Sequence, residues 1–430
     1  MVPACSKSTR RCRGCSRFRS GNHSRFEGRP IISRISSSAE TPARLYRSRV
    51  RSARSHRSTT RATHSPGAVD RALSSLPRSS RFEEAGCAKI GAVSRRLLLF
   101  AATTGYQIRV FAEAARRLGV DLTLATDRCH VLEDPWGDRA IAVRFDRIAE
   151  SIEALRGHRF DGVLAVGDQP AVLAAETAAV FGLRFHPPAA ARACCDKFLA
   201  RQLYQASGLR VPPFFRASLG EDPGALAARA PYPCVLKPLG GSASRGVIRA
   251  NNEDEFLEAL RRIRKMGERE LQVEGYIEGR EFAVEGLATA GQFEPLAIFD
   301  KPDPLEGPFF EETLYVTPSR EPAGVQQELL GTVNRAVGAL GLRHGPVHAE
   351  LRYNARGAWI VEAAARPIGG LCARALRFKP DVPLEQLILR HALGEEVART
   401  EPADPASGVM MIPIPKGGVY ESVEGLERAR

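Results

Sequence analysis

The amino-acid sequence predicts an α/β protein in which a doubly wound parallel sheet is followed by a two-part α+β region. Three observations lead to this fold class. From Arg95 onward, short apolar runs alternate with amphipathic helical patterns, as in parallel sheets whose strands are connected by helices. A β-forming run at 232–238 then ends in a lysine and a glycine-rich loop. Beyond residue 270, strand patterns separated by tight turns dominate.

The charge of the chain is concentrated in one segment. The 430 residues are enough for two or three domains and carry a formal net charge of +13. Residues 1–90 hold 18 Arg and 2 Lys against 5 acidic residues, whereas residues 91–430 hold 42 basic and 44 acidic residues. The main part is therefore close to neutral, which argues against a nucleic-acid partner. No apolar run approaches the ~20 residues that span a bilayer, so we expect no membrane association.

An arginine- and serine-rich tail, residues 1–92, precedes the predicted fold. It shows no apolar periodicity and buries too little surface to offset chain entropy, so we expect it to be disordered. Three interpretations stay open: a transit peptide, a nucleic-acid-binding arm, or sequence translated from upstream of the true start. We favour the third, which requires a non-methionine start near Val93 because Met266 is the first methionine after Met1.

Nine cysteines are scattered along the chain, a distribution that suits a reducing cytoplasm. Cys12 and Cys15 form a CxxC motif, but no second pair or histidines follow at zinc-site spacing. We therefore expect a cytoplasmic protein without a zinc site.

Residues 93–190 are expected to form the first domain. The run RRLLLFAA predicts a buried strand, and the helical pattern that follows ends at Gly119 before a second strand, VDLTLATD. Two further strands, AIAVRFD and DGVLAVGD, alternate with helices over 147–155 and 171–181. The TTGY turn lacks the spacing of a dinucleotide-binding loop, although topology alone allows a substrate pocket at these strand ends.

Residues 191–271 are expected to form a smaller second unit. Asp196 is placed to cap a helix that runs to Gln205, which puts Lys197 in the first turn. Taken alone, such a lysine is more often an exposed residue at a helix start. A second, amphipathic helix is predicted over 253–265.

The strongest functional signal in this unit is the stretch YPCVLKPLGGSASRGV, residues 232–247. Its strand is expected to stop at the Lys-Pro pair, because proline cannot continue a ladder. Lys237 would then supply a fixed charge to a polyphosphate, while small residues let backbone N–H groups close on the oxygens. These small residues include Gly240, Gly241, Ser242 and Gly246. A glycine-rich hairpin with a surface lysine is the alternative interpretation.

Residues 272–430 are expected to form the third unit. The stretch ELQVEGYIEGREFAVEGLATAGQFEPLAIFDK predicts a β-meander with turns at 278–279 and 290–291. After a loop at 303–312, a helix over 325–340 leads to two strands, HGPVHAELRYN and AWIVEAAARP, joined by a tight turn.

Two glutamates on these last strands are candidate metal ligands. If the hairpin register pairs Glu350 with Glu362, two carboxylates lie within reach of one hard cation such as Mg²⁺. Directly opposed glutamates destabilise a hairpin unless a positive charge lies between them. Arg366 follows the second strand, and after it come Gly369 and Gly370, where backbone approaches a ligand closely.

Together these motifs resemble the ATP-grasp superfamily. The likeness rests on Lys197, on Lys237 with its glycine loop, on EGYIEGRE and on the glutamate pair, and it extends from about Lys197 to Gly370. Each motif alone is weak, whereas their order and spacing are specific. The resemblance implies a two-subdomain α+β ATP-grasp fold over 191–271 and 272–430, behind an N-terminal β/α domain.

The resemblance also implies a role for each candidate residue. Lys197 and Lys237 would contact ATP phosphates, with Lys301 as a further candidate. Glu350 and Glu362 would hold Mg²⁺, or alternatively Mn²⁺. The remaining nucleotide contacts would come from an adenine-binding backbone segment and a ribose-binding glutamate: Glu274, Tyr276, Ile277 and Glu281.

The pattern EAAARPIGG, preceded by GPVHAE, is similar to a dipeptide-forming branch that includes L-amino-acid ligases and carnosine synthase. There the equivalent of Arg366 faces the acyl phosphate and substrate, and a loop glutamate, here Glu311 or Glu312, holds the substrate amine. Gly369 and Gly370 belong to the same substrate side. Ala364 departs from the family pattern, in which many members have asparagine. Similar chains continue with further strands, so a truncated last subdomain stays an open alternative.

The sequence thus predicts an ATP-dependent carboxylate–amine ligase that forms an acyl phosphate and releases ADP and phosphate. Lys237 and Arg366 would stabilise the charge that develops during transfer. The expected substrates are small carboxylates and amines, amino acids first among them, and a homodimer is an option. Three alternatives stay open: a purine-biosynthesis or biotin-carboxylase-type ligase, a non-catalytic nucleotide binder, and a nucleic-acid-binding protein acting through its basic tail.

Overall fold

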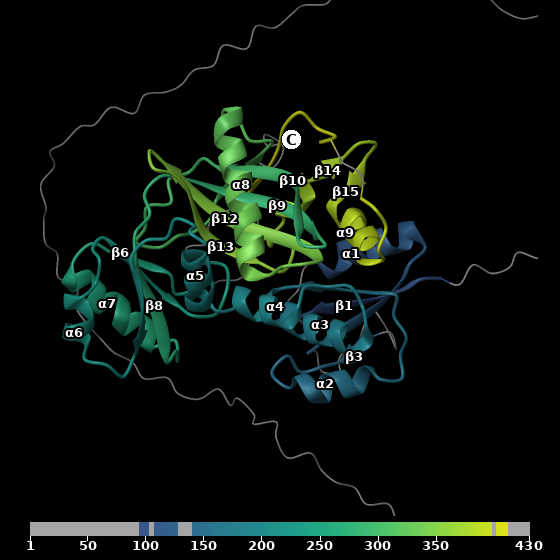
Figure 1. Cartoon of the computed structure of the whole chain (residues 1–430), viewed down its shortest axis with the longest axis horizontal. Coiled ribbons are helices and arrows are strands. Elements are labelled where there is room, and N and C mark those ends of the chain that lie inside the picture. Colours follow the sequence, from purple (N-terminus) through teal and green to yellow (C-terminus); the bar gives the residue numbers. More distant parts are fainter. Residues whose placement is uncertain (1–93, 103–106, 128–139, 398–400, 412–430) are drawn as a thin grey trace, which may run out of the picture. The chain divides into compact units, whose positions relative to one another are not determined.

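The structure is a computed structural model that describes residues 94–102, 107–127, 140–397 and 401–411. The expectations for the 1–92 tail, the TTGY turn and the end of the chain lie outside these residues. The described strands form three larger sheets and a two-stranded ribbon (Figure 1). No helix in the described part is long and apolar enough to cross a membrane.

The first sheet is parallel, which confirms the prediction for this region. In order across the sheet, its strands are β3 (Ala140–Ala142), β2 (Asp121–Thr126), β1 (Arg96–Ala101) and β4 (Gly162–Val166). Its covering helices are α1 (Ile108–Leu118), α2 (Ile148–Leu155), α3 (Asp168–Phe181) and α9 (Leu384–Ala392). Alternate residues of β1 face opposite sides: Leu98 and Phe100 pack with α3, whereas Leu97 and Leu99 pack with α1 and α9. Both faces are therefore covered, and α9 arrives from far along the chain.

The second sheet is small and antiparallel. Its strands are, in order, β5 (Phe214–Ser218), β8 (Glu270–Gly275), β6 (Cys234–Pro238) and β7 (Ile248–Ala250). Two helices complete its core, α6 (Pro223–Ala228) and α7 (Glu253–Arg264). Strand β6 ends at Pro238, which pairs opposite Leu271, so the strand stops at the Lys-Pro pair as the sequence predicts. A proline at the last position of a strand sacrifices only its own missing N–H.

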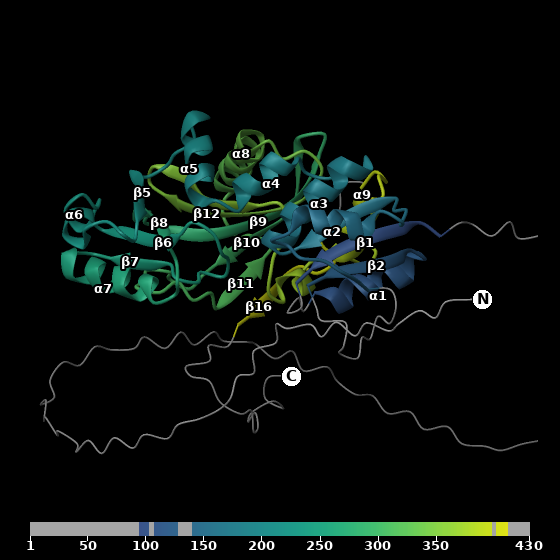
Figure 2. The same ribbon diagram turned by 90° about the horizontal axis from the view of Figure 1, so that it is seen from below.

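The third sheet is the largest. Its strands are, in order, β13 (Gly357–Ala364), β12 (Gly345–Asn354), β9 (Arg280–Thr289), β10 (Gln292–Lys301), β11 (Leu314–Thr317) and β16 (Ser407–Met410). Figure 2 shows β11 and β16 side by side at one edge. Helix α8 (Ala323–Leu340) lies across the sheet, and its Leu329 and Val333 pack in one core with Val347 and Ile360 (Figure 1).

The expected β-meander is wrong at its first turn and correct at its second. Strand β8 pairs with β5 and β6, so residues 276–279 carry the chain from the second sheet to the third. Gly279 has a φ of +119°, and a Cβ atom there would lie 2.3 Å from the carbonyl oxygen of Tyr353. This crossing therefore requires glycine. At Ala290 and Gly291, by contrast, β9 and β10 form a hairpin.

Two short helices, α4 (Pro188–Cys194) and α5 (Lys197–Ala206), connect the first sheet to the second. Both contribute to a hydrophobic core that includes residues of β1 and of the third sheet, whereas the second sheet has a core of its own. The remaining elements are η2 (Cys372–Ala375), β14 (Arg377–Phe378) and β15 (Val382–Pro383).

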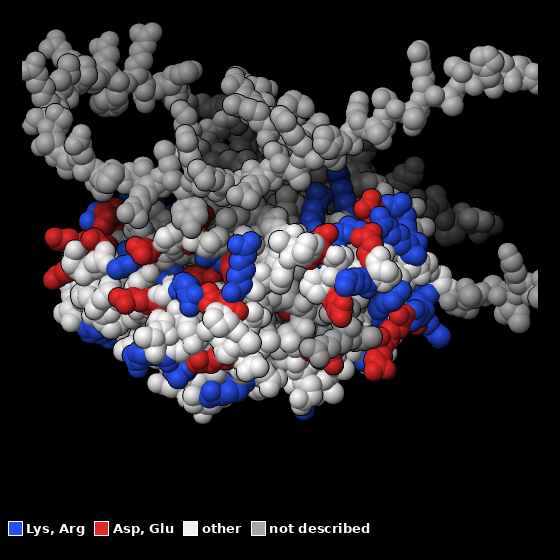
Figure 3. All heavy atoms as spheres, turned by 90° about the horizontal axis from the view of Figure 1, so that it is seen from above, with Lys and Arg blue, Asp and Glu red and all other residues white. Residues whose placement is uncertain are grey.

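Charged side chains of both signs are mixed on the surface. On the face shown in Figure 3, the described lysines and arginines lie interspersed with aspartates and glutamates. This distribution agrees with the near-neutral balance of residues 91–430.

Candidate functional site

The β12–β13 hairpin has the register that the sequence analysis requires. Glu350 lies directly opposite Glu362, and a β-bulge follows at once, because Leu351 pairs with Ile360 and leaves Val361 as the extra residue. Residues opposite each other in an antiparallel pair have Cβ atoms roughly 5 Å apart, so both carboxylates rise from one place on the sheet.

Each of these glutamates has a lysine partner. The Nζ atom of Lys197 lies 3.7 Å from Glu362 Oε2, and that of Lys301 lies 3.2 Å from Glu350 Oε1. The two ammonium groups thus supply the positive charge that an opposed glutamate pair needs.

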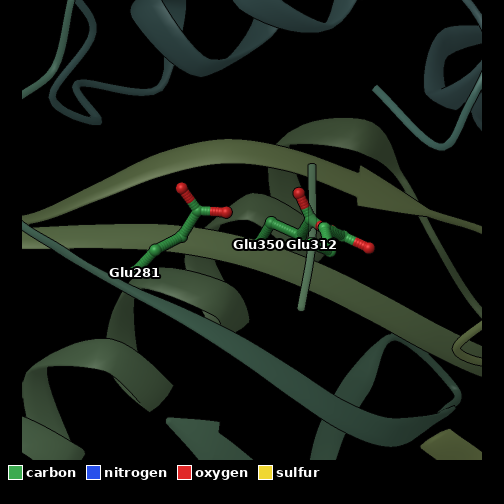
Figure 4. A group of neighbouring side chains, drawn as sticks. All are labelled: Glu281, Glu312 and Glu350. Carbon is green, nitrogen blue, oxygen red and sulfur yellow. The ribbon is translucent and has the colours of Figure 1, made fainter. Parts of the chain in front are cut away.

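Lys301 is surrounded by three carboxylates. Besides Glu350, its Nζ atom lies 2.9 Å from Glu281 Oε1 and 3.0 Å from Glu312 Oε1. Glu281 and Glu350 come from the neighbouring strands β9 and β12, and Glu312 comes from the loop before β11 (Figure 4). Oxygen atoms of these three glutamates lie within 4.8 Å of one another, which is metal-site spacing, and Glu362 is not a member of the group. Glu312 therefore lies in the site, whereas Glu311 is exposed.

The charges in this cluster shift one another's pKa values. Burial alone would lower the pKa of Lys301, but Glu350, Glu281 and Glu312 outweigh it and raise that pKa well above its usual value. Burial would raise the pKa of Glu350, but Lys301 and His348 hold it well below the usual range. The pKa of Glu312 is raised, because burial and the charge of Glu350 outweigh Lys301. Of Glu312 and Glu350, Glu312 is therefore the first to take up a proton.

A buried histidine extends the cluster on the other side. His348 pairs across the strands with Glu285 in register, its Nδ1 hydrogen-bonds the Glu285 carboxylate, and its Nε2 lies 3.5 Å from Glu350 Oε1. Burial opposes the charged imidazolium, but Glu285 outweighs it and raises the pKa of His348 to about 9. The other oxygen of Glu285 accepts a hydrogen bond from the Ile368 N–H at 3.0 Å. This series of contacts connects the loop after Arg366 to Glu350.

Lys197 connects the glycine loop to the glutamate hairpin. Asp196 caps α5 by accepting hydrogen bonds from the N–H groups of Phe198 and Leu199 at 3.0 Å, as the sequence predicts. Lys197 Nζ donates to the carbonyl oxygen of Gly241 at 2.7 Å while facing Glu362. It is therefore not a freely exposed lysine.

The glycine loop between β6 and β7 has an unusual backbone. Gly241 and Gly246 have φ values of +90° and +76°, and the non-glycine residues Ala243 and Ser244 also have positive φ. Turn conformations with positive φ also occur in loops whose backbone N–H groups bind anions. Gly240 and Ser242 lie in the same loop, and a Cβ atom on Gly240 would lie 3.7 Å from the Cys195 carbonyl oxygen.

Lys237 is buried, so the alternative interpretation, a glycine-rich hairpin with a surface lysine, is wrong about the lysine. Only 5% of the residue is exposed, and its Nζ lies 2.5 Å from Glu274 Oε1. Burial lowers the pKa of Lys237, and Glu274 partly offsets this. Burial would raise the pKa of Glu274, but Arg201 and Lys237 lower it. Gln272 Nε2 completes the group with a hydrogen bond of 2.5 Å to Glu274 Oε2.

The segment that crosses between the sheets is held by Arg352. Its Nη1 donates to the Tyr276 hydroxyl and to the Ile277 carbonyl oxygen, both at 2.8 Å, and its Nε donates to Glu281 Oε2 at 2.9 Å. The Tyr276 N–H bonds the Pro233 carbonyl oxygen at 2.8 Å. Two backbone groups of this segment are thus already engaged within the protein.

Arg366 is anchored by the first sheet. Its Nε donates to Asp168 Oδ1 at 2.7 Å, and Asp168 begins α3 directly after β4. Burial would lower the pKa of Arg366, but Asp168 and then Glu362 outweigh it and raise that pKa further. The Arg366 guanidinium group is thus held at the carboxyl end of β4 by its pair with Asp168. Gly369 follows, and Gly370 has a φ of +61°.

Sequence reasoning missed five residues of this site. They share one property, a partner distant in the sequence, and they are Asp168, Arg201, Glu285, His348 and Arg352. A signal existed for three of them, because polar residues repeat every second position in β12 (348, 350 and 352) and stand four positions apart in β9 (281 and 285), so that each set shares one face.

Comparisons with known proteins agree with this geometry. A family model described as ATP-grasp domain matches residues 230–375. The crystal structure of the L-amino acid ligase from Bacillus licheniformis superposes with a TM-score of 0.66 at 26% identity, covering 78% of this chain and 84% of that one.

Two sequence relatives extend the likeness. The ATP-grasp enzyme fsqD of Aspergillus fumigatus is 27% identical over 56% of this chain and 45% of its own length. Carnosine synthase 1 of Gallus gallus is 28% identical over 66% of this chain and 33% of its own length. The chain thus spans less than half of each of these two relatives. Residues 230–375 thus match the ATP-grasp domain, and the chain as a whole is similar to ligases that form carbon–nitrogen bonds.

Proposed function

We propose that this protein is an ATP-dependent carboxylate–amine ligase that forms an amide or peptide-like bond and releases ADP and phosphate. The observation that carries the proposal is the register that sets Glu350 opposite Glu362. Lys197 and Lys301 lie beside this pair, whereas the other two cationic candidates, Lys237 and Arg366, pair with Glu274 and Asp168. Similarity to an L-amino acid ligase supports the same reaction class.

The proposed reaction has two steps. An oxygen of the substrate carboxylate attacks the γ-phosphorus of ATP, and the bond to the β–γ bridging oxygen breaks with release of ADP. The nitrogen of the amine then attacks the carbonyl carbon of the acyl phosphate, phosphate leaves with the C–O bond electrons, and the amine proton passes to solvent. The first step brings two anions together, so positive charge and alignment dominate catalysis. Lys197 and Lys237 bind the phosphates, and Arg366 faces the acyl phosphate.

The residues present fit a hard divalent cation. Carboxylate oxygens are the ligands that Mg²⁺ prefers, and Glu350 and Glu362 offer them from opposed positions of one hairpin. Mg²⁺, or alternatively Mn²⁺, would supply charge neutralisation of the phosphate oxygens when bound. Lys301 and Lys197 are positioned to exchange their carboxylate partners for phosphate oxygens.

The remaining site residues take the following roles. The backbone of Glu274, Tyr276 and Ile277 holds adenine through groups other than the Tyr276 N–H and the Ile277 carbonyl, which are bonded to Pro233 and Arg352, and Glu281 holds the ribose hydroxyls. The loop with Gly240, Gly241, Ser242 and Gly246 closes over the phosphates and excludes water. On the substrate side, the amine-binding candidate is Glu312 rather than Glu311, and Gly369 and Gly370 give close backbone approach.

The substrates we propose are amino acids, one as the carboxylate and one as the amine. We further propose a division into an N-terminal domain (93–190), a small nucleotide-binding subdomain (191–271) and a large subdomain (272–430). A cytoplasmic setting is supported by the described cysteines, which are free thiols: Cys194, Cys195, Cys234 and Cys372. The oligomeric state is to be measured, and a homodimer is the state to test first.

The test is ADP and phosphate release by the full-length protein, screened against pairs of amino acids, with bicarbonate and single carboxylates as further arms. Turnover that needs both an amino-acid carboxylate and an amine supports the proposal. Turnover with bicarbonate alone would assign the protein to a carboxylase-type reaction instead.

Glu362→Ala should lower ATP turnover at least a hundredfold, because the pair then loses one of its two carboxylates. Glu294→Ala, a change at an exposed glutamate of β10, is the matched control and should leave turnover unchanged. Full phosphate release by Glu362→Ala would show that the metal assignment is wrong.

A further inference from the structure

Arg201 is among the most deeply buried charged residues of the described chain, with 1% of its surface exposed. It lies on α5, and the hydrogen bonds of its guanidinium group reach two other strands, β8 and β13. The Nε and Nη2 atoms lie 3.0 Å and 2.9 Å from Glu274 Oε2, at the end of β8. Nη1 donates to the Ile360 carbonyl oxygen at 2.6 Å, and Nη2 donates to the Val361 carbonyl oxygen at 3.1 Å, both in β13.

These two carbonyl groups sit at the β-bulge beside Glu362. The bulge places an extra residue, Val361, between the pairs formed by Ile360 and Glu362. A bulged strand loses regular ladder bonds at the extra residue, and a buried carbonyl without a partner is costly. The planar guanidinium of Arg201 satisfies both carbonyls at once, which a lysine ammonium with its point charge does less well.

The spacing of two residues on α5 explains how this one helix contacts both the Glu362 carboxylate and the backbone just before Glu362. Lys197 and Arg201 are four residues apart, so they lie on the same face of α5, one turn from each other. Lys197 faces the Glu362 side chain, and Arg201 holds the backbone just before it. Glu274 in turn fixes the orientation of the guanidinium group.

We propose that Arg201 is a positioning residue: it holds the β13 bulge in the form that points the Glu362 carboxylate toward the cation site. The hydrogen-bonding groups of Arg201 are engaged by Glu274, Ile360 and Val361, so its proposed effect on the site passes through Glu362. The inference rests on the proposed function insofar as Glu362 is a metal ligand.

The experiment compares full-length Arg201→Lys and Arg201→Met with wild type. Arg201→Lys keeps the positive charge beside Glu274 and so protects the fold, while it removes the forked contact to the two carbonyls. The matched control is Arg335→Met, because Arg335 Nη2 donates to the Ser207 and Gly208 carbonyl oxygens at 3.2 Å and 2.8 Å, away from the bulge.

Two quantities are measured. The first is hydrogen exchange of backbone amides in peptides covering 357–364, without nucleotide. The second is the Mg²⁺ concentration for half-maximal ATP turnover, separated from kcat at saturating Mg²⁺. We expect at least tenfold faster exchange and at least a tenfold higher Mg²⁺ requirement in both Arg201 variants, with neither change in Arg335→Met.

A merely structural role would reduce thermal stability and kcat while leaving the Mg²⁺ requirement at its wild-type value, and that result overturns the proposal. Unchanged exchange over 357–364 overturns it as well. If wild type turns over no ATP with any substrate, the proposed function fails separately, and the exchange measurement alone then decides whether Arg201 holds the bulge.

Discussion

At the scale of single residues, buried charges are held by partners from other elements. Lys301 of β10 lies among carboxylates of β9, β12 and a loop, and Arg366 after β13 pairs with Asp168 of α3. Removing one partner of a buried pair leaves the other charge uncompensated, which is more costly than losing the attraction itself.

Lys301→Met tests this at the most crowded position. The variant keeps the hydrocarbon stem but leaves Glu281, Glu312 and Glu350 without their common cation. We expect unfolding free energy at pH 7 to fall by about 3–5 kcal/mol. A divalent cation should replace part of the lost charge, so Mg²⁺ should raise the Tm of the variant more than that of wild type.

The control for this prediction is Lys379→Met, whose ion pair with Glu401 is solvent-exposed. Exposed pairs contribute about 0–1 kcal/mol, so its Tm should stay near that of wild type. Equal stability of Lys301→Met and Lys379→Met in urea unfolding contradicts the role of Lys301 as the common cation.

The sequence identified those site residues whose immediate neighbours in the chain indicate their role. Lys197 follows a helix cap, Lys237 ends a strand before glycines, and the two hairpin glutamates are joined by a tight turn. Asp168 and Arg201 carry no such signal, because 198 and 159 residues separate them from their partners Arg366 and Ile360. Only the folded topology brings these groups together.

At the scale of elements, the N-cap Asp196 fixes the first turn of α5, which carries the site residue Lys197. Asp196→Ala removes two hydrogen bonds to the first turn, which should cost about 1 kcal/mol in urea unfolding. Because Lys197 is the next residue, we also expect the KM for ATP to rise several-fold.

The matched control is Asp222→Ala at the start of α6, where the aspartate caps through the Ala225 N–H at 2.8 Å. It should lose similar stability with an unchanged KM. If both variants have the same KM for ATP, the N-cap of α5 does not contribute to phosphate binding.

Helices and strands with strong apolar periodicity lie at the positions that the sequence predicts, whereas the pairing of the strands was not predicted. Strands β1, β2 and β4 and helices α1, α7 and α8 lie where apolar spacing places them. The pairing of β8 with β5 and β6 escaped prediction, because a strand pattern reveals which face is buried and not which strand lies beside it. Helix α9 on the first sheet was missed for the same reason, since its partner lies over 200 residues upstream.

At the scale of the whole molecule, histidines lie where separate parts of the chain meet. His186 precedes α4, His344 precedes β12, and His391 lies in the last turn of α9. The rings of His344 and His391 stack with centroids 4.0 Å apart. Burial lowers the pKa of His186 to about 4 and that of His391 to about 3. These residues are therefore neutral in the folded protein near neutral pH.

Acid should destabilise the fold through these groups. Between a folded pKa of about 4 and an unfolded value of about 6.5, the unfolded state binds a proton that the native state excludes. Stability thus rises with pH in this window, and His186 alone accounts for about 2 kcal/mol lost between pH 7 and pH 5. Urea unfolding at both pH values measures this loss.

His186→Gln should reduce the acid-dependent loss, since glutamine offers an acceptor to the Arg343 N–H and a donor to the Pro346 carbonyl oxygen without titrating. His158→Gln, at an exposed position, should leave the loss unchanged. An identical loss in wild type and His186→Gln rules out His186 as its source.

The one-turn separation of Lys197 and Arg201 constrains how such chains diverge. Inserting or deleting a single residue between them would swing one cation by about 100° around the helix axis, away from the hairpin. Point substitutions elsewhere in α5 leave that geometry intact. The interval between these two positions is therefore a criterion for deciding which distant homologues have kept this arrangement.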